Sequence, residues 1–317
     1  MLEPTLKDIY DARSRIGGVV RRTPIERSLW LSELTGHDVF LKLDCWQRTR
    51  SFKLRGAFNA VARLSPDARA GGLVTASAGN HGQAVALAAR ELGARATIFV
   101  PTTGSVTKKA RIRALGAVLN EEYPTYDEAA VAAEAYAEAT GATYVHAFSD
   151  PAVVAGQGTL GLEVLEDLPW LHAVLVPVGG GGLIAGVGTA LKSASPGIKV
   201  IGVQSTQTRA MYDAFEAGRV TATDIGPTLA DGLAGCVDET SYRRALRVVD
   251  RMVLVDENAL PAAIRSLYHS DGIIAEGAAA VTVAAVMQKQ VQIEGPTVLV
   301  VTGGNIDASV FANIISS

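Results

Sequence analysis

The sequence has few of the features that mark secreted, metal-binding or nucleic-acid-binding proteins. Only two of its 317 residues are cysteines, and Cys45 and Cys236 have neither the spacing of a metal site nor that of a disulfide framework. It contains no run of lysines and arginines, and its formal net charge is −3. We therefore expect free thiols in a reducing cytoplasm, and neither nucleic acid nor an anionic membrane surface as a partner.

Long hydrophobic runs are also scarce. The segment Met1 to Asp8 lacks the basic and apolar regions of a signal peptide. One uncharged run, from Ala173 to Leu191, has the length of a membrane span, but it contains Pro177 and four consecutive glycines. This pattern is typical of a buried strand, a loop and a helix. We predict a protein without a membrane segment, located in the cytoplasm.

The remaining composition indicates a large α/β core. The chain is 48% hydrophobic, 19% charged and only 6% aromatic, and its length favours two lobes around one cleft. Apolar strands and helical periods alternate along the chain, which predicts parallel sheets with helices on both faces. We expect two open parallel-sheet lobes, a small one at residues 44–146 and a large one built from residues 1–43 and 147–317. The expected strands are residues 39–43, 73–76, 96–100, 117–119, 142–145, 173–176, 198–203 and 297–301.

A lysine at the start of a predicted helix is the first candidate for chemistry. Ser51 is placed to cap this helix, and Lys53 follows at its positive end, where cations are disfavoured. Lys53 is either a solvated surface residue or an amine that can attack a carbonyl. If Lys53 is a reactive amine, its pKa would be lowered by burial and by the neighbouring Arg48, Arg50 and Arg55. The stretch alone does not decide between them.

A glycine-containing turn follows the expected strand 73–76. Ser77, Ala78, Gly79, Asn80 and His81 lie where a parallel sheet and a helix N-terminus can bind an anion. Ser77, Asn80 and the local amides could cradle a carboxylate. The alternative is ordinary capping of the helix by Ser77 or Asn80, with His81 as a structural residue.

A second turn contains four glycines in a row, Gly179, Gly180, Gly181 and Gly182. Such a run loses much backbone entropy on folding, and it suits a loop that wraps closely around an anion at a helix N-terminus. A phosphate site is favoured over a plain tight turn. The turn also fits a loose dinucleotide fingerprint, but Gln204 stands where that fingerprint needs an acidic residue.

A third turn, Thr302 to Asn305, follows the last expected strand. Thr302 would present a neutral hydroxyl at the strand end, or it would cap a helix. The chain contains no motif of a serine hydrolase, a zinc protease or a Walker-type nucleotide site, and we expect no metal site.

Taken together, these motifs resemble one known family, the fold-type II pyridoxal-phosphate enzymes with a tryptophan synthase β-like fold. Within it the chain is most similar to the threonine and serine dehydratases, also called ammonia-lyases. The order and spacing match along nearly the whole chain. The matching segments are Ser51 to Ala57, Ser77 to His81, Asp150-Pro151 with Ala155 to Thr159, Gly179 to Leu183, Glu276 to Ala280 and Thr302 to Asn305.

The resemblance implies pyridoxal 5′-phosphate as the cofactor and assigns residues to it. Lys53 would form the Schiff base with the cofactor aldehyde, and Phe52 would pack against the cofactor ring. Asn80 would bond the phenolic oxygen, and Thr302 would face the pyridine nitrogen. The phosphate would be held by the backbone N–H groups of Gly179, Gly180, Gly181, Gly182 and Leu183.

The same resemblance implies a substrate and a reaction. Ser77, Ala78, Gly79, Asn80 and His81 would lie around the carboxylate of a small amino-acid substrate. A threonine hydroxyl cannot keep the pyridine nitrogen protonated, so the cofactor is a weaker electron sink, and loss of a β-hydroxyl is favoured over transamination. The resemblance therefore implies that L-threonine, L-serine or a close analogue becomes a 2-keto acid and ammonia, with the Lys53 amine removing the Cα proton.

Three departures from the family pattern qualify this expectation. Ala78 replaces the second serine of the serine racemases, so racemisation should be poor. Gln204, Thr208 and Ala210 replace the acidic residues that hold a divalent cation in many relatives, so we expect no metal dependence. Arg50 replaces what is often a glycine, and it either binds a second acidic group of the substrate or points to solvent.

Several alternatives stay open at this point. The chain ends soon after the Thr302 turn, which suggests the short, catabolic form without a regulatory domain. Enzymes for 3-hydroxyaspartate and for hydroxyectoine utilisation share this architecture, as do serine racemases. A catalytically inactive ligand sensor and a nicotinamide oxidoreductase are more distant candidates. A homodimer or homotetramer is the family expectation.

Overall fold

The computed structural model describes residues 3–316 and contains ten strands in two sheets. The six-stranded sheet has the order β1-β2-β10-β7-β8-β9, and the four-stranded sheet has the order β5-β4-β3-β6. The strands are β1 (Ile25–Arg27), β2 (Val39–Leu43), β3 (Leu73–Ala76), β4 (Ala96–Pro101), β5 (Val118–Tyr123), β6 (Thr143–Tyr144), β7 (Ala173–Pro177), β8 (Lys199–Ser205), β9 (Arg251–Val255) and β10 (Thr297–Val301).

Fourteen α-helices surround these sheets in the described part of the chain. They are α1 (Leu6–Ile16), α2 (Leu29–Thr35), α3 (Lys53–Ala62), α4 (Pro66–Ala70), α5 (Asn80–Glu91), α6 (Val106–Ala114), α7 (Tyr126–Thr140), α8 (Pro151–Asp167), α9 (Gly182–Ala194), α10 (Ala210–Ala217), α11 (Glu239–Leu246), α12 (Leu260–Asp271), α13 (Gly277–Met287) and α14 (Ala308–Ser316). No helix within residues 3–316 is both long and apolar enough to cross a membrane.

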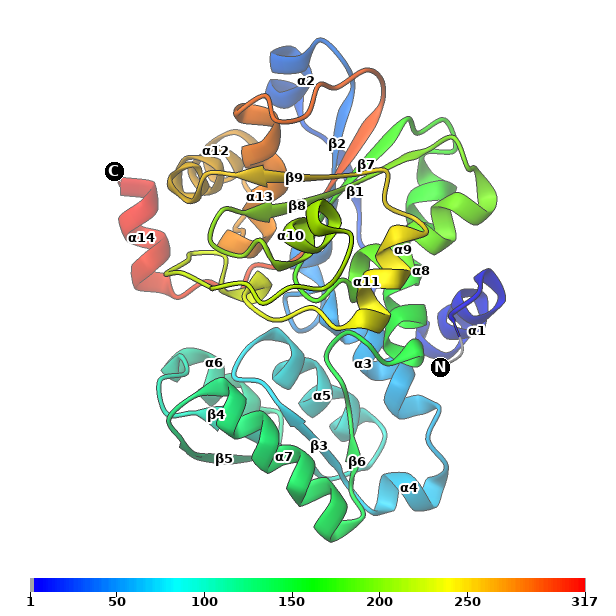
Figure 1. Cartoon of the computed structure of the whole chain (residues 1–317), viewed down its shortest axis with the longest axis vertical. Helices are drawn as coiled ribbons and strands as arrows, with labels where there is room; N and C mark the ends of the chain where they lie inside the picture. Colours follow the sequence, from blue (N-terminus) through cyan, green and yellow to red (C-terminus); the bar gives the residue numbers. More distant parts are fainter. Residues whose placement is uncertain (1–2, 317) are drawn as a thin grey trace.

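The two sheets form two lobes stacked one above the other, with α3 at their junction (Figure 1). All four strands of the smaller sheet fall within the predicted small-lobe range, and the exact lobe boundaries stay a prediction. The smaller sheet is parallel throughout, and the larger one is parallel except at one edge. The predicted α/β class with two open sheet lobes is therefore confirmed.

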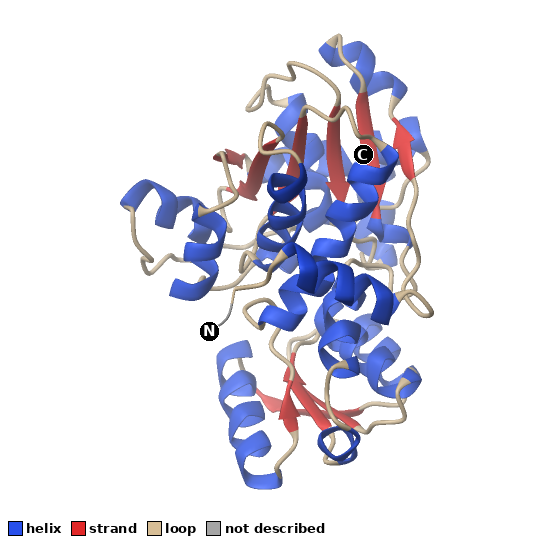
Figure 2. Cartoon of the chain, turned by 90° about the vertical axis from the view of Figure 1, so that its right-hand side faces the viewer, coloured by secondary structure: helices blue, strands red, loops and turns tan. Residues whose placement is uncertain are grey.

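Both faces of the larger sheet are covered by helices, as expected from strands that are apolar on both sides. Along β10, Val298 and Val300 pack toward α8, α9, α10 and α11, whereas Leu299 and Val301 pack toward α2, α12, α13 and α14. The smaller sheet follows the same rule, with α3, α5 and α6 on one face and α7 on the other. Figure 2 shows this layering of strands between helices.

Some elements were not predicted. β1 pairs antiparallel with β2, through Glu26 opposite Leu41, so the larger sheet is not parallel throughout. β9 and the helices α2, α4, α10, α11 and α14 were also missed. Most of these elements are short, and β9 extends the sheet only because β8 supplies its hydrogen-bonding partner.

The prediction that Ser51 caps the lysine helix is wrong. α3 begins at Lys53 with Phe52 as its N-cap, and no side chain caps it. The backbone of Ser51 instead forms an isolated antiparallel bridge with Gly303, and the buried Ser51 hydroxyl has no partner. A tertiary contact thus takes the place of the local cap.

A buried cluster of charges anchors α3 to the larger lobe. The Arg55 Nε donates to Asp44 Oδ2 at 2.7 Å, and its Nη1 donates to Glu163 Oε1 at 2.6 Å. Lys42 Nζ donates to the other oxygen of Glu163 at 2.5 Å and also to the carbonyl of Thr23. Arg55 and Lys42 are fully buried, so each charge depends on its partners.

We predict that Arg55→Met destabilises the protein by about 3–5 kcal/mol, because Asp44 and Glu163 then keep buried charges without their partner. Urea unfolding followed by circular dichroism measures this free energy. Arg27→Met is the matched control, since Arg27 pairs with Asp38 at the exposed surface, and its loss should be below about 1 kcal/mol. Equal losses for the two variants would contradict the role of the buried cluster.

Candidate functional site

Lys53 lies in the junction between the lobes and is not a solvated surface residue. Its Nζ donates to the carbonyl of Ala147 at 3.0 Å and lies 5.3 Å from the centre of the Phe52 ring. Burial lowers the pKa of Lys53 to about 8, and the nearby carboxyl of Glu276 opposes this shift. At neutral pH its amine is deprotonated far more often than that of an ordinary lysine.

The predicted cause of the lowered pKa of Lys53 is only half right. Burial acts as expected, but the arginines around Lys53 are engaged elsewhere. Arg55 is held by Asp44 and Glu163, and Arg48 pairs with Glu91 at 2.7 Å. The pKa of Lys53 therefore reflects the loss of water around its ammonium and not cationic neighbours.

Thr302 is brought beside this lysine by backbone pairing. The N–H of Phe52 donates to the carbonyl of Thr302 at 2.9 Å, and the N–H of Gly304 donates to the carbonyl of Arg50 at 2.9 Å. Thr302 is buried at the end of β10, well before α14 begins at Ala308. It is therefore a strand-end hydroxyl and does not cap a helix.

The turn after β3 places Asn80 between the lobes. α5 begins at Asn80 with Gly79 as N-cap, and no side chain caps it. The Ser77 hydroxyl accepts a hydrogen bond from the Gly79 N–H at 3.2 Å, which forms a tight local turn. Asn80 does not cap the helix, because its Nδ2 donates to Glu276 Oε1 at 2.6 Å and its Oδ1 accepts from Asn305 Nδ2 at 2.7 Å.

The side chain of His81 is turned away from this turn. Its Nε2 lies 2.9 Å from the carbonyl oxygen of Val145, and its ring is buried. Burial, reinforced by the charge of Lys53, lowers the pKa of His81 to about 3. The ring is neutral at physiological pH, so it supplies no positive charge to a substrate carboxylate.

The glycine loop passes close to Phe148 and leads into a helix whose first turn is uncapped. Gly181, at φ +88°, precedes α9, and the first turn of that helix has no side-chain cap. A Cβ on Gly180 would lie 2.5 Å from the Phe148 ring, and one on Gly182 would lie 2.6 Å from the Phe148 carbonyl oxygen. Only glycines allow the loop to pass this close to the segment that also carries Ala147, the acceptor of Lys53. Uncapped N–H groups at a helix start suit a phosphate.

Glu276 is a functional candidate to which the sequence analysis assigned no role. It is buried at the start of α13, and it also accepts a hydrogen bond from the Asn305 N–H at 3.1 Å. Burial and the charge of Asp231 raise its pKa to about 7, while Lys108 and the hydrogen bond from Asn80 act in the opposite direction. The sequence does contain a sign of this role, because Glu276 is the only charged residue between Gly272 and Gln288.

Further polar contacts join the lobes around this site. Lys108 Nζ lies 2.5 Å from Asp231 Oδ2, and the Ser105 hydroxyl donates to Asp307 at 3.0 Å. Arg111 Nη1 donates to Asn305 Oδ1 at 2.6 Å. These partners lie more than a hundred residues apart in the sequence, so no local pattern could reveal them.

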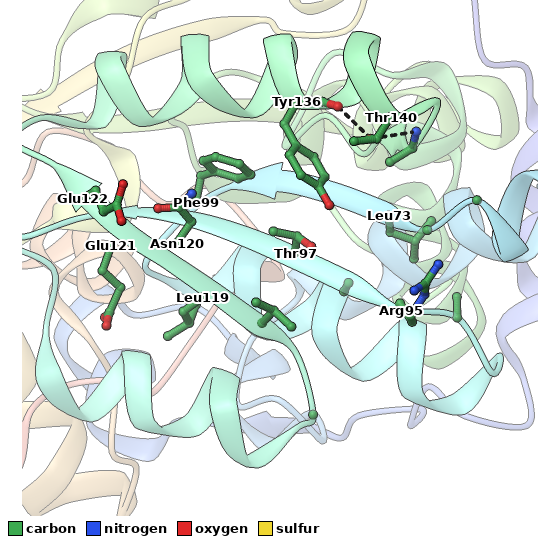
Figure 3. A pocket seen from close by; sticks show the side chains of 17 residues that line it. Leu73, Arg95, Thr97, Phe99, Leu119, Asn120, Glu121, Glu122, Tyr136 and Thr140 are labelled. Carbon is green, nitrogen blue, oxygen red and sulfur yellow. Dashed lines mark hydrogen bonds between the residues drawn. The ribbon is translucent and has the colours of Figure 1, made fainter.

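An open pocket of about 1020 Å³ lies elsewhere, between α7 and the smaller sheet (Figure 3). Thr97, Phe99, Asn120 and Tyr136 are among the residues that line it. None of the predicted site residues does, so this pocket has no part in the site around Lys53.

Comparison with known proteins identifies a family. Residues 16–303 match the model of the family described as "Pyridoxal-phosphate dependent enzyme". An L-threonine ammonia-lyase of Thermotoga maritima is 46% identical over 314 residues, 98% of this chain and 78% of that protein. The catabolic L-threonine dehydratase TdcB of Staphylococcus aureus is 40% identical over 98% of this chain and 92% of its own.

A solved structure of maize serine racemase is also similar. It has a TM-score of 0.94 and 28% sequence identity, and the match covers 99% of this chain and 98% of that one. The fold is therefore shared by lyases and racemases, and the fold alone does not choose between the two reactions.

The raised pKa of Glu276 predicts a pH dependence of stability. Between pH 4.5 and 7 the folded state keeps a proton that the unfolded state releases, so the free energy of unfolding falls as pH rises through this window. Glu276→Gln should remove this part of the slope, on the order of 3 kcal/mol across the window. Urea unfolding at several pH values measures it, and parallel profiles of variant and wild type would refute the shift.

Proposed function

Because the chain belongs to the family of pyridoxal-phosphate dependent enzymes, we propose that it dehydrates L-threonine, L-serine or a close β-hydroxy amino acid to a 2-keto acid and ammonia. The observation that carries this proposal is the identity of 46% and 40%, over nearly the whole chain, to an L-threonine ammonia-lyase and an L-threonine dehydratase. The predicted family, cofactor and carbon–oxygen lyase class are confirmed by these relatives.

The residues present suit pyridoxal phosphate. The uncapped start of α9 at Gly181 and Gly182 would hold the phosphate, together with Gly179, Gly180 and the N–H of Leu183. The Lys53 amine would bind the cofactor aldehyde, with Phe52 against the ring and the buried hydroxyl of Thr302 at the pyridine nitrogen. When bound, the cofactor draws electrons from the substrate Cα and makes its proton removable.

Lys53 is suited to take that proton. With its pKa near 8, a large fraction of its amine is neutral at mildly alkaline pH and can act as a base. The Ala147 carbonyl accepts a hydrogen bond from Nζ and would hold the amine in place between cycles. Lys53 would thus serve as both the cofactor anchor and the principal base.

The turn at residues 77–81 would hold the substrate carboxylate. The Ser77 hydroxyl and the Asn80 N–H lie at the uncapped start of α5, and Gly79 holds the Ser77 hydroxyl in place through its own N–H. His81 would contribute through its backbone, since its neutral ring bonds Val145. Ala78 offers only a methyl group, so the opposite face of Cα has no acid or base from this position, which favours elimination over racemisation.

Arg50 is the residue that would distinguish an acidic substrate from a neutral one. This residue has φ +59°, a left-handed conformation that favours glycine, which accounts for the glycine often found there in the family. Its guanidinium nitrogen lies 3.2 Å from the position a Cβ on Gly304 would take, over the turn that follows Thr302. Arg50 is exposed, which fits both an acidic group of the substrate and solvent, so a 3-hydroxyaspartate stays the alternative substrate, beside those of hydroxyectoine utilisation.

A cytoplasmic location and a homodimer or homotetramer complete the proposal. The first is supported by two free thiols, Cys45 and Cys236, which suit a reducing compartment. The second remains an expectation from the family.

We expect the holoenzyme to absorb visible light through its lysine-bound cofactor and to release keto acid from L-threonine or L-serine. Lys53→Ala should abolish both signals. A screen of threonine, serine, both 3-hydroxyaspartate diastereomers and phenylserine, read as keto-acid formation, identifies the substrate. Arg50→Gly run in parallel should reduce only turnover of an acidic substrate. A colourless wild type that cannot be reconstituted would refute the proposed function.

Activity should not require a divalent cation. In the region where many relatives carry acidic cation ligands, the Gln204 side chain donates to the Val178 carbonyl and accepts from the Tyr212 N–H. Dialysis against a chelator should therefore leave keto-acid release unchanged, and adding Mg²⁺ should not raise it. A severalfold loss that Mg²⁺ restores would contradict this prediction.

A further inference from the structure

Asn80 belongs to a closed ring of hydrogen bonds at the lobe junction. It donates from Nδ2 to one oxygen of Glu276, while the other oxygen of Glu276 accepts from the Asn305 backbone N–H. Asn305 closes the ring by donating from its own Nδ2 to Asn80 Oδ1 at 2.7 Å. A carboxamide nitrogen carries two hydrogens, so the ring leaves one Nδ2–H of Asn80 for a ligand.

The direction of these bonds is set by a fourth residue, Arg111, together with the backbone carbonyl of Thr49. A guanidinium only donates, so the Asn305 oxygen must face Arg111, at 2.6 Å. The Asn305 nitrogen then has to face its two acceptors, the Thr49 carbonyl at 2.8 Å and Asn80 Oδ1. If the Asn305 carboxamide were reversed, its NH₂ group would face the guanidinium of Arg111, and both groups are donors. Its oxygen would face the carbonyl of Thr49, and both of these are acceptors.

The four residues come from both lobes. Arg111 lies on α6 and Asn80 begins α5, at the top of the lower lobe in Figure 1, whereas Asn305 follows β10 and Glu276 precedes α13 in the upper lobe. The Arg111–Asn305, Asn305–Asn80 and Asn80–Glu276 bonds therefore each cross the junction, and the Asn305–Glu276 bond lies within the upper lobe. Arg111 is an exposed residue, so its side chain can be removed without opening the core.

We propose that Arg111 is a positioning residue which, through Asn305, sets the orientation of the Asn80 carboxamide so that its free Nδ2–H faces the cofactor. This inference rests on the proposed function, because it concerns the group that would bond the phenolic oxygen. Without Arg111, the Thr49 carbonyl is the remaining backbone group that opposes reversal of the Asn305 carboxamide. An Asn305 that reverses makes Asn80 turn an oxygen toward an oxygen of the cofactor. A mispaired hydrogen bond of this kind should lower kcat about tenfold and leave KM within about twofold.

The experiment compares Arg111→Ala with Arg111→Lys, which keeps a donor, and with Arg113→Ala. Arg113 is the matched control, since it lies on the same helix, is exposed and pairs with Glu121 away from Asn305. Three quantities are measured: the visible absorbance of the holoenzyme without substrate, kcat and KM for the substrate found in the screen, and the side-chain amide NMR signal of Asn80 in cofactor-free protein. An Asn80→Ala spectrum identifies that signal.

We expect Arg111→Ala to shift the absorbance band, lower kcat and move the Asn80 signal, Arg111→Lys to recover part of each, and Arg113→Ala to resemble wild type. Unchanged absorbance and NMR signals in Arg111→Ala would overturn the proposal, as would equal changes in Arg113→Ala. A wild type that takes up no pyridoxal phosphate would refute the proposed function instead. In that case the NMR spectra of cofactor-free Arg111→Ala and wild type test the role of Arg111. A shifted Asn80 signal supports the positioning of Asn80 by Arg111, and an unchanged signal overturns it.

Discussion

The backbone pairing between residues 50–52 and 302–304 is the contact on which the site depends. It joins the segment before α3 to the end of β10 through the Phe52–Thr302 and Gly304–Arg50 hydrogen bonds and the Ser51–Gly303 bridge. Lys53 and Thr302 thereby come together although 248 positions separate them. The same pairing accounts for the start of α3 without a side-chain cap, because the backbone of Ser51 is held against Gly303 in the turn after β10.

Burial at the lobe junction accounts for the electrostatics of the site. It lowers the pKa of Lys53 to about 8 and that of His81 to about 3, and it raises that of Glu276 to about 7. In each case the loss of water disfavours the charged form. The site therefore holds an amine that is easily deprotonated, a neutral imidazole and a carboxyl that changes its charge near neutral pH.

The contacts that hold the two lobes together also position the residues of the site. Arg55, two residues after Lys53, locks α3 to Asp44 and Glu163 and so limits how far the lysine can move. The segment at Ala147 and Phe148 touches both the Lys53 amine and the glycine loop. Asn80, Asn305 and Glu276 tie the lobes together at the same place. We therefore expect substitutions at two of these positions to have non-additive effects on stability and activity.

The sequence by itself determined the α/β class, the main strands and helices, and the motifs at Lys53, Asn80, Gly179–Gly182 and Thr302. These features are local, because the hydrophobic periodicity, the glycine content and the turns from strand to helix are each encoded within a short stretch of sequence. The family resemblance added the cofactor and the reaction class, because the order of the motifs is specific.

Only the tertiary structure decided what surrounds each motif. It showed that Ser51 does not cap α3, that Lys53 is shifted by burial and not by arginines, and that the His81 ring bonds Val145. It also revealed Glu276 and Asn305 as partners of Asn80, and Arg111 as a partner of Asn305. These facts depend on contacts between distant segments and on the exclusion of water at the lobe junction, and no pattern within a short stretch of sequence carries that information.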